Sequence, residues 1–243
     1  MTETTGSSQA AAATAAAAPI RLIVATHNEG KLKEIRAVLS QRLGDQAERF
    51  DIVTAGSLGL PDPVEDGVTF EENALIKARD VARRTGQAAL ADDSGLIVDV
   101  MGNAPGILSA RWAGTHGDDA ANNRLLLAQM ADIPDEHRGA RFVCCMALVV
   151  PLPDGGYEER TVQGVMPGHL LHEPHGTNGF GYDPLFVPDE QPVRTQAGAE
   201  VPQPDAPQVL TSADMTAAEK NAISHRGRAI RAMVPIIEEL LLH

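Results

Sequence analysis

The chain has 243 residues, of which 43% are hydrophobic, and this is enough to bury a sizeable core in one large domain or two small ones. Its formal net charge of −13 argues against a nucleic-acid polymer as partner, because such binding normally needs a basic face. A single nucleotide is compatible with this charge, since a local pocket and a metal ion override the net field.

Residues 1–19 are rich in Ala, Thr and Ser and lack the basic residues and apolar core of a targeting signal, so they are predicted to be a disordered tail. No apolar run approaches the ~20 residues of a membrane-spanning helix, and no membrane partner is expected. The two cysteines, Cys144 and Cys145, are neighbours on a predicted strand, where adjacent side chains point to opposite faces. They are interpreted as reduced core thiols, which favours a cytoplasmic protein.

Strands and helices alternate in the first part of the chain. Apolar spacing predicts strands over residues 20–25 and 50–54 and a helix over 30–39. A capping box, in which the side chains of Thr69 and Glu72 accept each other's backbone N–H groups, opens the next helix. Two short strands, over 88–91 and 96–100, are then expected on either side of an acidic turn.

The second part of the chain combines a long hairpin with helices. The predicted elements are a helix over 118–130, hairpin strands over 141–152 and 157–165, a capping box at Thr216 and Glu219, and a last helix over 226–242. Residues 191–211, rich in Pro, Gln and Ala, are expected to form a mobile insertion. This order of elements predicts a single α/β domain over residues 20–243 with a mixed central sheet.

The segment Thr26-His27-Asn28-Glu29-Gly30-Lys31 joins the first predicted strand to the first helix. A helix N-terminus offers unpaired N–H groups and a partial positive charge, so it is a ready-made anion site. Lys31 is unfavourable for the helix dipole in that first turn, and a bound phosphate would explain its presence. The alternative is a solvated lysine at a helix start.

Asp92 and Asp93 are expected at the carboxyl end of a strand, the edge where ligands bind in open α/β sheets. Because neighbouring side chains point apart, one carboxylate can face a site while the other supports it. Glu65 and Asp66 offer further oxygen ligands, which together with phosphate oxygens suit Mg²⁺. The alternative is a solvated acidic turn.

A glycine-rich segment at residues 176–184 carries Phe180 and Tyr182, although only 3% of the chain is aromatic. Glycine lets a backbone approach a ligand closely, and both rings are candidates to stack on a base. The alternative is a glycine-rich turn with core aromatics.

Lys220 and the segment Ser224-His225-Arg226-Gly227 form a third candidate group. Lys220 and Ser224 are four residues apart on one predicted helix face, and Gly227 is expected to end or bend that helix. A pocket lined with donors such as Arg226 would favour a 6-keto purine over adenine. The alternative is that Lys220 and Arg226 are solvated.

In this order, the motifs resemble the non-canonical purine nucleoside triphosphate pyrophosphatases of the inosine triphosphatase type, the dITP/XTP pyrophosphatases. The resemblance covers about residues 20–241 and departs in the tail and at 191–211. The matching motifs are Thr26-His27-Asn28-Glu29-Gly30-Lys31, Thr69-Phe70-Glu71-Glu72-Asn73-Ala74, Ala91-Asp92-Asp93-Ser94-Gly95-Leu96, Pro105-Gly106-Ile107-Leu108-Ser109-Ala110-Arg111, Gly179-Phe180-Gly181-Tyr182-Asp183-Pro184 and Ser224-His225-Arg226-Gly227.

The resemblance implies an elongated, mixed central sheet flanked by helices, a homodimer, and Mg²⁺-dependent hydrolysis of ITP, dITP and XTP to the monophosphate and pyrophosphate. Glu65 and Asp93 would hold Mg²⁺, with Asp66 as the alternative to Glu65, and Asp93 would also be the general base for water. The triphosphate would be held by Thr26, His27, Asn28, Glu29, Gly30, Lys31 and Lys220. The other implied substrate contacts are Ser94 and, around the base, Phe180, Gly181, Tyr182, Asp183, His225 and Arg226.

Two rival functions are weighed against this one. A phosphatase with an aspartyl nucleophile also places acids after a strand, but it usually shows Asp-x-Asp, whereas here the acids are adjacent. A nucleotide sensor that binds without hydrolysis would not need a water-activating carboxylate beside phosphate-binding lysines.

Overall fold

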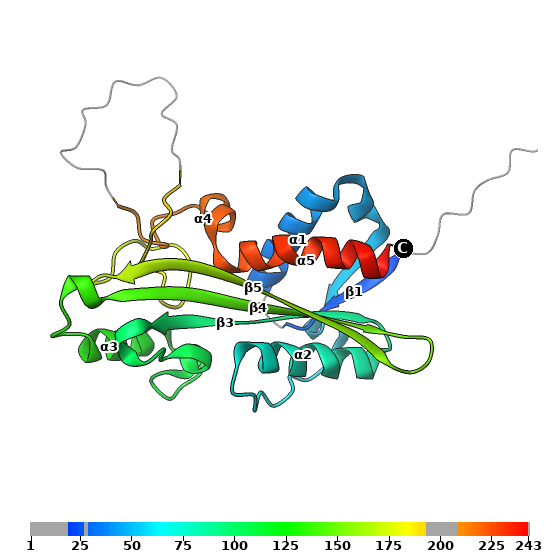
Figure 1. Cartoon of the computed structure of the whole chain (residues 1–243), viewed down its shortest axis with the longest axis horizontal. Helices are drawn as coiled ribbons and strands as arrows, with labels where there is room; N and C mark the ends of the chain where they lie inside the picture. The colour runs from blue at the N-terminus through cyan, green and yellow to red at the C-terminus, as the bar shows by residue number, and fades with distance from the viewer. Residues whose placement is uncertain (1–18, 27–28, 193–208, 243) are drawn as a thin grey trace, which may run out of the picture.

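The structure is a computed structural model that describes residues 19–26, 29–192 and 209–242, so the predicted tail and most of the predicted insertion lie outside it. Figure 1 shows a long sheet with helices on both sides. In chain order the helices and strands are β1 (Ile20–Val24), α1 (Glu29–Leu43), β2 (Phe50–Thr54), α2 (Phe70–Thr85), β3 (Ala88–Val98), α3 (Asp119–Gln129), β4 (Gly139–Pro151), β5 (Tyr157–Leu170), β6 (Phe186–Pro188), α4 (Ala217–Ile223) and α5 (His225–Leu241).

The sheet is mixed, with the strand order β2-β1-β3-β4-β5-β6. β1 runs parallel to β2 and β3, whereas β4, β5 and β6 add to β3 as an antiparallel series. The three long strands β3, β4 and β5 give the sheet its elongated shape (Figure 1). The predicted mixed, elongated α/β sheet is therefore confirmed.

The two faces of the sheet carry different helices. Ala88 and Leu90 of β3 lie in a core with residues of α1 and α5, whereas Ala89 and Ala91 lie in a second core with residues of α2. This alternation follows from the period of two along a strand. Cys144 belongs to the first core, Cys145 is largely buried in the second, and both are free thiols, as predicted.

The predicted helix starts are confirmed where local capping determines them. Thr69 caps α2 with Glu72, and Thr216 caps α4 with Glu219, each pair forming a complete capping box. The α2 helix ends at Thr85 and is followed by Gly86, which has the left-handed conformation that glycine adopts at low cost. Within the described residues, no helix is long and apolar enough to cross a membrane.

The prediction of two short strands around Asp92 is wrong, because β3 runs without a break from Ala88 to Val98. The pairing with β4 is continuous along this whole stretch, so the acidic residues keep their ladder partners. β1, by contrast, pairs with β3 only as far as Leu90. Asp92 and Asp93 therefore lie beyond the carboxyl end of the neighbouring β1, not at the end of their own strand.

Two boundaries near the C-terminus also differ from the prediction. The margins of the predicted insertion are packed: Gln191 donates to the carbonyls of Pro188 and Leu210, and the buried Thr211 donates to the carbonyl of His175. Gly227 does not end a helix, because α4 already ends at Ile223, and the Ser224 hydroxyl accepts from the Gly227 N–H and caps α5.

Candidate active site

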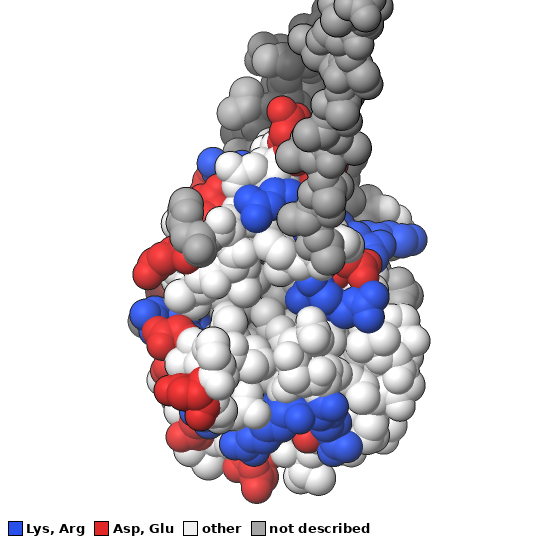
Figure 2. Space-filling view, turned by 90° about the vertical axis from the view of Figure 1, so that its right-hand side faces the viewer, with Lys and Arg blue, Asp and Glu red and all other residues white. Residues whose placement is uncertain are grey.

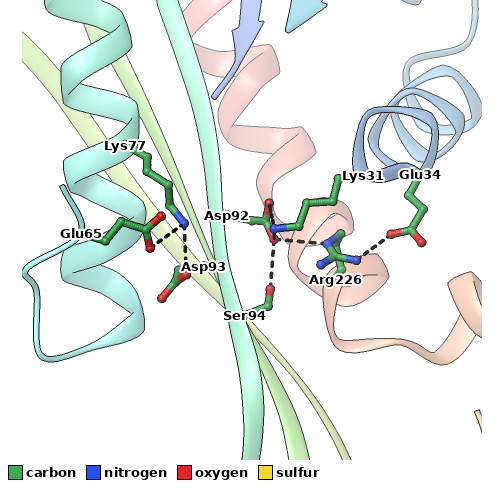
Figure 3. Close-up of polar contacts among 8 residues, drawn as sticks. All are labelled: Lys31, Glu34, Glu65, Lys77, Asp92, Asp93, Ser94 and Arg226. Carbon is green, nitrogen blue, oxygen red and sulfur yellow. Dashed lines mark hydrogen bonds and ion pairs between the residues drawn. The ribbon is translucent and has the colours of Figure 1, made fainter. Parts of the chain in front are cut away.

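Asp92 and Asp93 point to opposite faces of β3 and collect different partners (Figure 3). Lys31 and Arg226 approach Asp92 from α1 and α5. On the other face, Lys77 of α2 approaches Asp93. The prediction that the two carboxylates point in different directions is confirmed, and the strand between them joins two charged clusters.

The cluster on the α1 and α5 side is centred on Asp92, which is 3% exposed. The Lys31 Nζ lies 3.2 and 3.1 Å from its two oxygens, the Arg226 Nε donates to Oδ2 at 3.2 Å, and the Ser94 hydroxyl donates to the same oxygen at 3.0 Å. Burial alone would raise the pKa of Asp92, but the charges of Lys31 and Arg226 outweigh it and hold that pKa well below its usual range. Asp92 is therefore an ionised anchor for two cations.

Arg226 has a second carboxylate partner. Its Nη1 donates to Glu34 Oε2 on α1 at 2.8 Å, so the buried guanidinium joins α5 to both β3 and α1. Its Cζ also lies 5.9 Å from the centroid of the Phe180 ring. Arg226 thus reaches from the Asp92 cluster to the predicted base pocket.

The cluster on the α2 side contains Glu65, Lys77 and Asp93. The Lys77 Nζ lies 3.1 Å from Asp93 Oδ1 and 3.4 Å from Glu65 Oε2, and the Asn73 amide donates to Asp93 Oδ2 at 3.3 Å. Two carboxylates thus converge on one cation. Asp66 is exposed and Glu65 half-buried, which favours Glu65 over Asp66 as the partner of Asp93.

Burial and charge act against each other in this second cluster. Burial raises the pKa of Asp93, and the ammonium of Lys77 offsets this only in part. Burial alone would lower the pKa of Lys77, but Asp93, Asp92 and Glu65 together raise it. Lys77 is therefore charged, and the Asp93 carboxylate is more basic than an ordinary aspartate.

Lys77 and Asn73 were not among the predicted site residues. Both lie on the buried face of α2, next to Ala74 and Ala78. The sequence signal for Lys77 is a lysine on the apolar face of a predicted helix, because a buried charge of this kind needs a partner in the core.

Phe180 is 51% exposed, and its ring lies near two cations. The Lys220 Nζ is 4.9 Å from its centroid and pairs with Asp183 Oδ2 at 2.5 Å, while Arg226 lies on it as described. The same Asp183 oxygen accepts from the Phe180 N–H at 2.9 Å. The structure therefore brings Phe180, Asp183 and Arg226 together, which were expected around the base, and adds Lys220, which was expected to hold the triphosphate.

Tyr182 differs from this prediction. Its ring is only 3% exposed, packs in the core cluster of Leu96 and Phe186, and donates its hydroxyl to the carbonyl of Ser109 at 2.9 Å. The expectation that this ring offers a stacking face is wrong, because the core at the far end of the sheet takes up the side chain. Only the Tyr182 backbone remains available to the predicted pocket.

His225 is buried at the start of α5 and stacks on Phe142, with ring centroids 5.0 Å apart. Burial, together with the charges of Arg226 and Lys220, holds its pKa well below the usual range, so the imidazole is neutral. Among the described residues, its Nδ1 has no hydrogen-bond partner. A neutral imidazole with a spare nitrogen suits the recognition of a polar base edge.

The predicted phosphate segment is described in part. Thr26 is buried after the end of β1, and its carbonyl accepts from the Gly56 N–H. His27 and Asn28 lie outside the described residues, and Glu29 and Gly30 form the start of α1. Lys31, in the first turn of that helix, is the member of the segment seen to face the site.

Comparisons with known proteins agree with this architecture. The dITP/XTP pyrophosphatase of Bifidobacterium animalis subsp. lactis is 58% identical over 91% of this chain and 98% of its own length. That of Streptomyces coelicolor is 53% identical over 91% and 98%. The crystal structure of the nucleoside-triphosphatase / dITP/XTP pyrophosphatase from Mycobacterium abscessus is 46% identical, with a TM-score of 0.65 and coverage of 89% of this chain and 100% of that one.

A HAM1 protein structure from Coxiella burnetii is 35% identical, with a TM-score of 0.72 and coverage of 90% of this chain and 99% of that one. The expected inosine triphosphatase-like fold is therefore confirmed. The model of the Ham1 family matches residues 22–236. With a match over most of its length and relatives of this similarity, the chain belongs to the Ham1 family.

Proposed function

We propose that this chain is a nucleoside-triphosphate pyrophosphatase that hydrolyses the non-canonical purine nucleotides dITP, XTP and ITP to the monophosphate and pyrophosphate. Such an activity removes these nucleotides before they enter DNA or RNA. The observation that carries the proposal is the pair of charged clusters on the two faces of β3, just beyond the end of β1. Glu65 and Asp93 contact Lys77 on one face, and Asp92 contacts Arg226 on the other. The names of relatives 58% and 53% identical to this chain support the same chemistry.

Glu65 and Asp93 fit a magnesium ion. Their carboxylates converge on one positive charge, the ammonium of Lys77, so the protein already favours a cation there. Among the described residues no three His, Cys, Asp or Glu side chains cluster as a metal cage, but Mg²⁺ commonly uses one or two carboxylates together with substrate phosphates. When bound, the ion would supply positive charge to the phosphate oxygens.

Asp93 is the proposed general base. Its carboxylate is oriented by the Asn73 amide, which donates to Oδ2, and by Lys77, which contacts Oδ1, so that it could accept a proton from a water molecule. Lys31 and Lys220 are proposed to hold the triphosphate together with Thr26, His27, Asn28, Glu29 and Gly30. The ammonium groups of the two lysines would stabilise the charge that develops on the leaving pyrophosphate.

The base pocket is proposed around the exposed face of Phe180. The ring would stack on the purine, and Arg226 and the neutral His225 would donate to or accept from the base edge. Asp183 and the backbone of Gly181 and Tyr182 would shape the wall, and Ser94 would contact the substrate from β3. Donors at this edge favour a 6-keto purine over adenine.

The proposal also includes a homodimer in the cytoplasm, without nucleic-acid or membrane partners. Two free, buried thiols suit a reducing compartment. Figure 2 shows one end of the molecule, where basic residues lie in several separate groups with uncharged residues between them. Sedimentation of the purified chain would test the dimer.

The deciding experiment is pyrophosphate release from dITP, XTP, ITP, GTP and ATP, each with and without Mg²⁺. We expect Mg²⁺-dependent release that strongly favours dITP, XTP and ITP. Release of orthophosphate with a phospho-aspartate trapped on Asp93 would replace the proposal with an aspartyl phosphatase. Binding of ITP by calorimetry without any product would replace it with a sensor.

A further inference from the structure

The loop that carries Phe180 is held by α3 through the backbone of its next residue. Gly181 donates its N–H to Asp119 Oδ2 at 2.6 Å, and its carbonyl accepts from the Asn123 amide at 2.9 Å. Asp119 and Asn123 are four residues apart and share one face of α3. One helix therefore binds both polar backbone groups of a single loop residue.

The position of Gly181 explains why this double contact matters. Gly181 has a φ of +61°, which glycine adopts at little cost, and it lies directly between the exposed Phe180 and the buried Tyr182. Tyr182 is itself held, because its hydroxyl donates to the carbonyl of Ser109. The backbone on the C-terminal side of Phe180 is thus held at two successive residues by contacts from outside the loop.

The Phe180 ring itself lies near Lys220 and Arg226. The Lys220 Nζ is 4.9 Å and the Arg226 Cζ 5.9 Å from the ring centroid. Phe180 is about half exposed, so neighbouring side chains enclose it only in part, and the direction of the ring depends on the backbone that bears it. The bonds from α3 act on that backbone without touching the ring. They are well placed to keep the aromatic face beside the two cations.

We propose that Asp119 and Asn123 are positioning residues of the base pocket, which act through Gly181 to hold the Phe180 ring in place. This inference rests on the proposed function, in which Phe180 stacks on the purine. The two side chains hydrogen-bond to the loop backbone, so their loss should weaken substrate binding and leave the chemical step nearly intact.

A purely structural role for Asp119 is the competing explanation, because an acid in the first turn stabilises a helix. A substitution of the neighbouring Asp118 distinguishes the positioning role from the structural one. Asp118 is the N-cap of α3, and its carboxylate accepts from the Ala121 N–H at 2.9 Å. Asp118→Ala therefore weakens the same helix without touching Gly181, which makes it a matched control.

The test compares Asp119→Ala, Asn123→Ala, Asp119→Asn and Asp118→Ala in the full chain. Amide hydrogen exchange of the segment around Gly181 reports the contact itself, and KM and kcat for ITP with Mg²⁺ report its use. We expect Asp119→Ala and Asn123→Ala to speed exchange and raise KM about fivefold to tenfold, with kcat within about twofold of the parent. Asp119→Asn should keep the exchange rate and KM of the parent, because its amide oxygen still accepts from the Gly181 N–H.

Asp118→Ala should lower the melting temperature and leave KM and the exchange of this segment unchanged. Unchanged exchange in both Asp119→Ala and Asn123→Ala would overturn the inference, as would an equal rise of KM in Asp118→Ala. Faster exchange with an unchanged KM would also overturn it. In that case KM of Phe180→Ala shows whether the proposed base pocket itself is wrong. A raised KM in Phe180→Ala would leave the base pocket standing, whereas an unchanged KM there would remove the pocket itself.

Discussion

Arg226 and Asp92 form an ion pair in which the side chains are only 5% and 2% exposed. The Arg226 Nε donates to Asp92 Oδ2 at 3.2 Å and so ties the start of α5 to the middle of β3. Lys31 contacts the same carboxylate, and Glu34 accepts from the same guanidinium. The cations proposed to meet the substrate are therefore also partners of a buried carboxylate, and changes in them have both structural and functional consequences.

Asp92→Asn should destabilise the fold. The substitution removes the charge that compensates Lys31 and Arg226, and breaking a buried pair costs about 3–5 kcal/mol. Because Glu34 still accepts from Arg226, we expect a loss of about 3 kcal/mol in the free energy of unfolding, measured in urea. The control is Asp51→Asn, which breaks the exposed pair with Arg21. A loss no larger than that of the control would contradict the role of Asp92 as an anchor.

Asp93→Asn should keep the fold and lose most turnover. The side chain retains its size, but it can no longer hold a metal ion as a carboxylate or accept a proton from water, so we expect kcat to fall about 10²- to 10⁴-fold. Pyrophosphate release from ITP and the melting temperature are the measurements. Asp99→Asn, on the partly exposed pair with Arg141, is the control. Parent-like turnover would refute both proposed roles of Asp93.

Arg226→Lys and Arg226→Ala should narrow the preference for ITP over ATP. Lysine keeps a charge beside Asp92 and Glu34 but loses the planar fork that can donate to a keto oxygen. We expect the ratio of kcat/KM for the two substrates to fall about tenfold in both variants, with a further loss of stability only in Arg226→Ala. A ratio that stays at the parent value would remove Arg226 from base selection.

Gly164→Ala should displace the start of α5. A Cβ on Gly164 would lie 2.0 Å from the carbonyl oxygen of His225 and 2.6 Å from the Ala229 nitrogen, and neither backbone atom can move without the helix. We expect a loss of about 1–3 kcal/mol in the free energy of unfolding and a raised KM for ITP, because His225 and Arg226 move with the helix. The matched control is Gly139→Ala, whose Cβ would meet a side-chain oxygen of Asp99 at 3.1 Å. Equal effects of the two substitutions would argue against this close approach.

His225 should make the protein less stable as the pH falls below about 6.5. The imidazole is neutral in the folded state because burial and the nearby cations lower its pKa, whereas the unfolded chain binds a proton at about pH 6.5. The unfolded state is therefore favoured below that pH, by about 1.4 kcal/mol for each further unit, and unaffected above it. Unfolding in urea between about pH 7.5 and 5.5 should show this loss in the parent and not in His225→Phe. Parallel profiles of the two proteins would disprove it.

Features that depend on a few neighbouring residues could be predicted from the sequence. The capping boxes at Thr69 and Thr216 were predicted and are complete in the structure, because each needs only groups within four residues. The opposite directions of Asp92 and Asp93 also follow from the local period of a strand. The order of the motifs was enough to indicate the family.

Features that depend on distant partners were decided by the tertiary structure. The polar run at Asp92 remains in β3 because β4, about fifty residues later, pairs along it. Tyr182 packs into the core because the carbonyl of Ser109 accepts a hydrogen bond from its hydroxyl. Lys77 lies in the site because the carboxylates of Glu65 and Asp93 compensate its charge. Such contacts join groups far apart along the chain, and their energies depend on burial that exists only once the sheet and helices have packed. The sequence thus determined the local caps, the strand periodicity and the set of motifs, whereas packing decided which side chains of those motifs face the site.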